Sequence, residues 1–131
     1  MNRRRMAPPP AGEKAAPPRR KVPAPRVPPL PGQGSYVVAY LRDPREKVWG
    51  LLLRMEAAGF WIRGIELNAF EDWAREVRSA VSPSMGLSTT FLPFLRVEKI
   101  VADERTGSMS SLAERFEALA GRPVGEFAGL K

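Results

Sequence analysis

The amino-acid sequence predicts a mainly β protein, a small antiparallel barrel with about five strands, two helices packed on it and a disordered basic arm. Three observations lead to this prediction. Short runs rich in β-branched and aromatic residues follow one another between residues 36 and 103, joined by tight turns. Two other stretches repeat their apolar residues at helical spacing. Proline and net positive charge gather in the first 34 residues.

The predicted arm comprises residues 1–34. It holds 10 of the 14 prolines, eight of the 21 Lys and Arg residues, and one of the 14 acidic residues. The remaining 97 residues carry 13 basic and 13 acidic side chains, so the net charge of +7 belongs to the arm. Such a segment buries too little apolar surface to offset the entropy of ordering it. We therefore expect it to be disordered and to sample the polyproline II conformation.

Residues 35–104 make up the predicted barrel. Its strands are expected, in chain order, at 36–42, 47–56, 60–67 and 89–103. Short turns join the first three, which is typical of an antiparallel meander. Pro93 cannot donate to a strand ladder, so it is expected at an edge, at a bulge or at a break that divides the last stretch into two strands.

The second strand has a predicted buried face, because apolar residues alternate along it with a less apolar set. The residues of this face are Trp49, Leu51, Leu53 and Met55. Gly50 and Gly64 lie inside strands, where glycine often marks a bend or a close approach of two backbones.

Two helices are predicted beside the strands. The first is inserted at 69–78, where Asn68 and Glu71 are expected to cap its start. Its apolar stripe consists of Phe70, Trp73, Ala74 and Val77. The second lies in the C-terminal region, 105–131, with Ser111 and Glu114 as a capping box and Gly121 at its end.

The run GLLLRMEAAGFWIRG begins a strand with Gly50, places Glu56 six residues later and ends on a strand with Arg63. This pattern resembles the Sm-like small barrels, which include the bacterial host-factor RNA chaperone. The later run LRVEKIVAD resembles the paired closing strands of that family, so the resemblance covers about 36–103. It implies a closed barrel able to form rings. It does not imply the uridine site of the bacterial members, because Phe94 and Leu95 stand near the places of their lysine and histidine.

Several classes of function are disfavoured by residues that the sequence lacks. The chain has neither His nor Cys, which removes disulfides, thiol nucleophiles, imidazole bases and most zinc, haem or iron–sulfur sites. The carboxylates Glu71, Asp72 and Glu76 fit a solvated helix surface better than a catalytic group. We therefore expect a non-enzymatic protein without metal or cofactor. No apolar run reaches the roughly 20 residues of a membrane span, and we expect a cytoplasmic protein without a membrane partner.

Candidate binding residues lie in two places. The arm offers cations that can neutralise phosphates: Arg3, Arg4, Arg5, Arg19, Arg20, Lys21 and Arg26. On the third strand Trp61 alternates with Arg63, and it is the tryptophan expected to be exposed for base stacking. The sequence thus predicts a non-catalytic protein that contacts RNA, DNA or a ribonucleoprotein electrostatically. The alternative is a protein–protein or homo-oligomeric module that uses its edge strands, with the arm as a linker.

Overall fold

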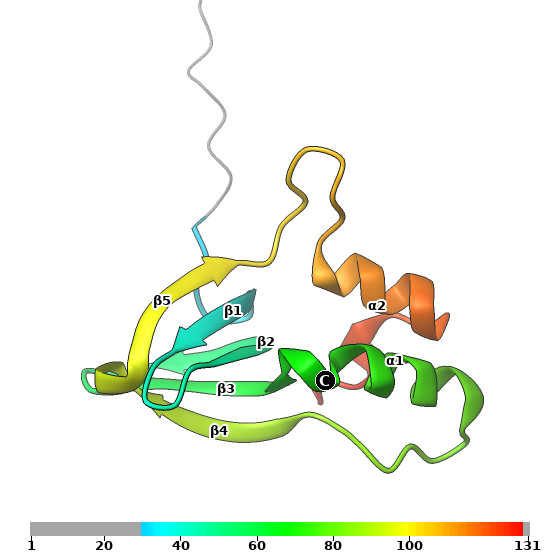
Figure 1. Cartoon of the computed structure of the whole chain (residues 1–131), viewed down its shortest axis with the longest axis horizontal. Helices are drawn as coiled ribbons and strands as arrows, with labels where there is room; N and C mark the ends of the chain where they lie inside the picture. Colours follow the sequence, from blue (N-terminus) through cyan, green and yellow to red (C-terminus); the bar gives the residue numbers. More distant parts are fainter. Residues whose placement is uncertain (1–29, 130–131) are drawn as a thin grey trace, which may run out of the picture.

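The computed structural model describes residues 30–129, which form one five-stranded antiparallel sheet and two helices (Figure 1). The strands are β1 (Tyr36–Leu41), β2 (Glu46–Met55), β3 (Gly59–Glu66), β4 (Ser88–Pro93) and β5 (Val97–Ala102). The helices are α1 (Phe70–Ser79) and α2 (Leu112–Ala120), with short 3-10 turns η2 (Leu67–Ala69), η3 (Phe94–Arg96) and η4 (Val124–Glu126). The prediction of a mainly β protein with two helices is confirmed. No helix of the described part is long and apolar enough to cross a membrane.

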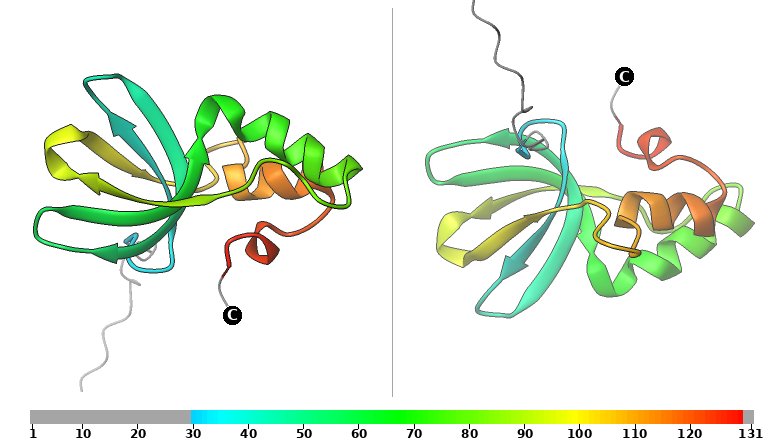
Figure 2. Two further views of the ribbon diagram at one scale, coloured as in Figure 1. Left: turned by 90° about the horizontal axis from the view of Figure 1, so that it is seen from below. Right: turned by 90° about the horizontal axis from the view of Figure 1, so that it is seen from above.

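The sheet has the strand order β4-β3-β2-β1-β5, so β4 and β5 are its edges. The first three strands form the expected meander, β4 pairs with β3 after the intervening helix α1, and β5 returns to pair with β1. Pro93 ends the edge strand β4, as its missing N–H predicts. Only the turn η3 separates β4 from β5 along the chain, so the end of one lies close to the start of the other. The sheet is accordingly strongly curved, and its hairpins point away from the helices (Figure 2).

The strand β2 does not keep one face buried along its length. A register shift between Leu52 and Arg54 makes Leu53 an extra, bulged residue. Leu52 is buried, Leu53 is half-buried and Met55 is 51% exposed. The predicted buried face is therefore wrong beyond Leu51, because one inserted residue exchanges the two faces of a strand.

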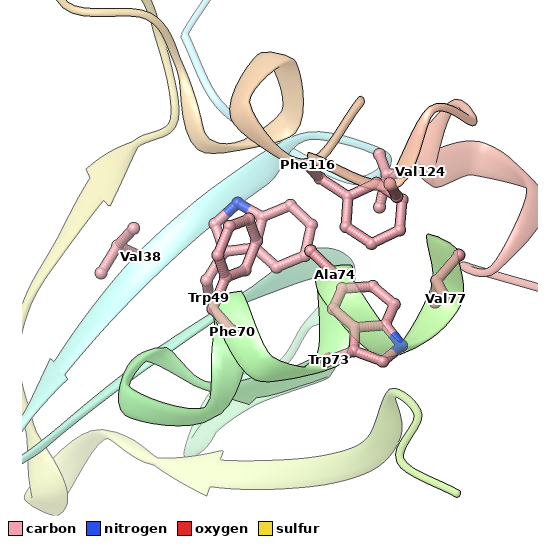
Figure 3. Close-up of a cluster of buried hydrophobic side chains, with 9 residues drawn as sticks. Val38, Trp49, Phe70, Trp73, Ala74, Val77, Phe116 and Val124 are labelled. Carbon is pink, nitrogen blue, oxygen red and sulfur yellow. The ribbon is translucent and has the colours of Figure 1, made fainter. Parts of the chain in front are cut away.

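Hydrophobic side chains fill both faces of the sheet. The helices cover one face, where they enclose the cluster shown in Figure 3, namely Val38, Trp49, Phe70, Trp73, Ala74, Val77, Phe116, Ala120 and Val124. A second cluster contains Val37, Ala39, Leu41, Leu52, Phe60, Ile62 and Leu92. The apolar stripe predicted for α1 belongs entirely to the first cluster, which confirms its orientation. Since Val37 and Val38 enter different clusters, β1 is buried on both sides.

The two helices begin in different ways. Asn68 does not cap α1, because it lies inside η2 and the N-cap is Ala69, which makes no side-chain hydrogen bond. That prediction is wrong. The capping box of α2 is confirmed: the Glu114 amide donates to Ser111 Oγ, and the Ser111 amide donates to the Glu114 carboxylate. Gly121 ends α2 in the left-handed conformation at φ 78°.

Candidate functional site

The arm candidates Arg3, Arg4, Arg5, Arg19, Arg20, Lys21 and Arg26 lie outside the described residues, but the place where the arm joins the domain is visible. Residues 32–35 form a turn that is bound to the bulge of β2. The Gly34 amide donates to the Leu52 carbonyl, and the Leu52 amide donates to the Ser35 carbonyl, each at 2.8 Å. We call this turn the arm root.

Trp61 lies beside the arm root. A shallow hollow of about 340 Å³ is lined by Gln33, Leu53, Arg54, Trp61 and Thr89, and we call it the Trp61 hollow. Gln33 belongs to the arm root and Leu53 is the bulged residue of β2. The bulge that overturns the predicted strand face thus also brings the arm root next to the aromatic side chain that the sequence singled out.

The indole of Trp61 is held in place from two sides. Its ring packs on Phe91 of β4, with centroids 5.3 Å apart. Its N–H donates to Glu56 Oε2 at 3.2 Å, and the same oxygen accepts from Arg54 at 2.8 Å. The side chain is half-buried, so part of the ring is accessible in the hollow. A fixed aromatic surface of this kind can stack with a flat ligand at little cost in side-chain entropy.

Arg63 is placed differently, although it lies on the same strand face as Trp61. Its Nη1 donates to Thr89 Oγ1 at 2.8 Å. Its guanidinium lies against Gly129, where an added Cβ would be 2.9 Å from Nη2. The Nε atom is buried and has no hydrogen-bond partner within residues 30–129. The structure therefore brings Trp61 to the arm root and places Arg63 beneath the C-terminal segment.

The carboxylates of α1 have structural partners. Glu71 accepts hydrogen bonds from Arg115 of α2 and from Arg75, and the hydrogen bond from Arg115 is the main cause that lowers its pKa. The pKa of Glu76 is lowered chiefly by the hydroxyl of Ser84, 2.7 Å away. Within residues 30–129 no group of three or more acidic side chains is arranged to hold a metal ion.

The cations of the described part fall into two groups. Six form ion pairs: Arg54, Arg75, Arg96, Arg105, Arg115 and Arg122. Six form none with residues 30–129: Arg42, Arg45, Lys47, Arg63, Arg78 and Lys99. Four of the second group lie in the β1–β2 hairpin or on β5, so cations without an ion pair to residues 30–129 gather on that side of the sheet.

Two of these lysines flank one tyrosine, which sequence reasoning did not identify. Tyr40 of β1 is paired with Lys47 of β2 on one side and with Lys99 of β5 on the other. The two ammonium groups lie 5.1 and 4.7 Å from the centre of its ring. We call this set the Lys–Tyr–Lys row. The sequence shows all three residues, but only the strand register reveals that they are neighbours.

A further cavity of about 200 Å³ lies against the second hydrophobic cluster, with Leu41, Ile62 and Leu92 in its wall. Arg96 borders it and donates to the carbonyls of Arg42 and Pro44 and to Glu46. Through these hydrogen bonds the Arg96 guanidinium holds η3 against the β1–β2 turn, so Arg96 has a structural role there.

Neither a protein-family model nor a curated protein nor a solved structure matches this chain. The Trp61 hollow, the arm root and the Lys–Tyr–Lys row are therefore interpreted from their own chemistry.

Proposed function

We propose that the protein binds nucleic acid without catalysing a reaction, and that the arm contacts phosphates while Trp61 stacks on a base. The observation that carries this proposal is the position of the Trp61 hollow at the arm root, where Gln33 and Trp61 line one surface. A nucleic-acid strand whose phosphates are contacted by the arm would then lie next to the ordered ring of Trp61. Phosphate contacts by a cationic segment depend on counterion release, so binding should depend little on sequence and strongly on salt.

The arm offers contacts to phosphates and the domain offers a stacking surface, and this combination favours a single-stranded ligand. The arm has no aromatic residue within 1–34, so it offers no platform for bases. Stacking requires a base that is free of its neighbours, which loops and single strands provide. The arm also has few of the large apolar side chains that wedge into a lipid surface. RNA or single-stranded DNA, free or in a ribonucleoprotein, therefore fits both parts better than a membrane.

The barrel and its Sm-like type are part of the proposal. Support comes from the strand order, in which β5 returns to β1 and leaves β4 and β5 as the two edges. Further support comes from η3, whose three residues hold the ends of these edges near each other. Closing the gap between the edges would turn the curved sheet into a small barrel.

The decisive experiment compares three proteins for binding to a labelled single-stranded oligonucleotide by fluorescence anisotropy. They are the full chain, the chain without residues 1–29, and the full chain with Trp61→Leu. All buried residues of the described core lie after residue 29, so the truncation leaves that core in place. The truncation should weaken binding strongly, since it removes all eight cations of the arm. Trp61→Leu should weaken it by about 1–3 kcal/mol, the usual loss of one stacked base, and Trp61→Phe should retain most of the affinity. Equal affinity of the full and truncated chains would refute the proposal.

A second candidate function is strand pairing with another protein or another copy of this chain. Its support is that β4 and β5 each pair with only one strand of the described part, and that Ser88, Thr89 and Thr90 of β4 are exposed. Here the arm would be a linker, so removal of residues 1–29 should leave the association intact. Analytical ultracentrifugation of both chains tests this, and a full chain that stays monomeric at high concentration argues against self-pairing.

A further inference from the structure

We propose that the Lys–Tyr–Lys row is a phosphate-binding site through which the folded domain itself contacts nucleic acid. The inference rests on the proposed function and extends it, since it gives the nucleic acid a second contact away from the arm root. It concerns Lys47, Tyr40 and Lys99, on the three adjacent strands β2, β1 and β5.

The geometry of the row holds two ammonium groups against one ring. Both lysines are exposed, and neither forms an ion pair with any residue between 30 and 129. The Tyr40 ring attracts each ammonium group through its face, which limits the freedom of both side chains. Two cations held by one ring raise the positive potential at that point of the surface, which favours the binding of an anion. Because the lysines are already ordered, less entropy is lost when the anion binds.

Protection of a sheet edge explains the position of Lys99 but not that of Lys47. Lysine is common on edge strands, where it prevents pairing with other chains, and Lys99 lies on the edge strand β5. Lys47, however, lies on β2, between β1 and β3 in the middle of the sheet. An interior strand has no free edge to protect. The placement of both lysines on one ring is explained by a ligand that both contact.

The surroundings of the row fit a polyanion. Arg42 and Arg45, in the turn between β1 and β2, also form no ion pair within the described part of the chain. Asp43 and Glu98 lie on the same hairpin and strand, so the region is not purely cationic and a single small anion would gain little there. A chain of regularly spaced phosphates can contact several of the cations at once. The arm has the same sign of charge, which favours nucleic acid over an acidic protein as the shared ligand.

The test is the salt dependence of binding to a single-stranded oligonucleotide, measured on the full chain. Lys47→Gln/Lys99→Gln removes the two ammonium groups of the row. The control Arg75→Gln/Arg122→Gln removes two exposed charges from surface ion pairs of the helical layer. Each phosphate contact contributes about 0.7 to the slope of log K against log salt on single strands, so the lysine variant should flatten the slope by about 1.4. The control should leave it unchanged, and Lys47→Arg/Lys99→Arg should keep the full slope.

Equal slopes for the lysine variant and the unaltered chain would overturn the row as a binding site. An equal decrease of the slope in the lysine variant and in the control would overturn it too. Stronger competition by polyglutamate than by the oligonucleotide would also overturn it, in favour of an acidic protein partner. If the double variant does not fold, the single changes Lys47→Gln and Lys99→Gln should each flatten the slope by about 0.7. If the lysine variant keeps the full slope while binding still depends on the arm, this inference alone is refuted. If the unaltered chain binds no oligonucleotide, the proposed function is refuted.

Discussion

Gly50 of β2 and Gly64 of β3 face each other across the sheet at a distance that leaves no room for a side chain. A Cβ on Gly50 would lie 2.3 Å from the Arg63 carbonyl oxygen and 2.5 Å from the Gly64 Cα. A Cβ on Gly64 would lie 2.3 Å from the Trp49 carbonyl oxygen. The close approach that glycine inside a strand predicts is therefore confirmed, and it occurs on the stretch of β2 that leads into the Leu53 bulge.

Gly50→Ala should destabilise the protein. The added methyl group meets backbone atoms, which cannot rotate away, so the strands must separate locally. Overpacking of this kind costs roughly 1–3 kcal/mol or more. Chemical denaturation measures the loss. Gly125→Ala is the control, because its Cβ would meet nothing within 4 Å and its φ is not left-handed. A midpoint for Gly50→Ala equal to that of the control would contradict the close contact.

The bulge in β2 predicts opposite outcomes for two neighbouring leucines. Leu52 is 2% exposed within the second hydrophobic cluster, so Leu52→Ala should cost about 2–5 kcal/mol. Leu53 is half-buried at the edge of the Trp61 hollow, so Leu53→Ala should cost clearly less. Both free energies of unfolding come from the same denaturation series. A greater loss for Leu53→Ala would restore the simple alternation expected from the sequence.

The elements that sequence reasoning located correctly are those whose signals are local. The capping box of Ser111 and Glu114, the break at Pro93 and the glycines of the close approach each depend on a few adjacent residues. The start of α1 was misplaced because Leu67–Ala69 continues from β3 as a 3-10 turn, which removes Asn68 from the cap position. Nothing in the local sequence distinguishes the two arrangements.

The features that escaped prediction depend on pairing between distant residues. Alternation indicates which residues of a strand share a face, but the Leu53 bulge changes that face through its pairing with β3. That Tyr40 lies next to Lys47 and Lys99 follows from the registers of two strand pairs, β1–β2 and β1–β5. For Trp61 the sequence predicted exposure, and the side chain is half-buried. Its position beside the arm root follows from the bonds between residues 34 and 52.

Asp103 is a further residue whose role depends on distant partners, and it yields a stability prediction. Its carboxylate accepts the indole N–H of Trp49 at 3.0 Å and the amides of Leu112 and Ala113 at 2.7 and 2.9 Å. Asp103→Ala should leave the fully buried Trp49 with an unpaired donor, at a cost of about 1–3 kcal/mol, and should loosen the start of α2. Thermal unfolding measures it, with the exposed neighbour change Glu104→Ala as the control. Equal stability of the two variants would contradict this role.

The ion pair between Glu71 of α1 and Arg115 of α2 predicts a dependence of stability on pH. The hydrogen bond from Arg115, together with the charges of Arg115 and Arg75, keeps the pKa of Glu71 below its usual value of 4.5. Because the folded state then binds the proton less tightly than the unfolded chain, Glu71 stabilises the protein above about pH 4.5. That contribution is lost as the pH falls through the lowered pKa.

The matching experiment compares melting temperatures at neutral pH and near pH 3 for the unaltered chain, for Glu71→Gln and for Asp72→Asn. Glu71→Gln should show a smaller decrease on acidification, since the group that titrates is gone. Asp72 is exposed and has no ion pair with residues 30–129, so Asp72→Asn should retain the larger decrease. The same acid response in all three proteins would show that the Glu71 pair does not link the helices in solution.

The basic arm makes a quantitative prediction about salt, because each phosphate contact releases counterions. If about four to six of its eight cations reach phosphates at once, the slope of log K against log salt is about −3 to −5 on duplex DNA and shallower on single strands. Replacement of Arg3, Arg4 and Arg5 by Gln should weaken binding to all sequences alike, since contacts to phosphates carry no sequence information. It should also flatten the slope by about two to three at most. Anisotropy titrations at several salt concentrations give both quantities. If the chain without residues 1–29 bound as tightly as the full chain, with a flat salt response, recognition would have to reside in the domain, first at Trp61.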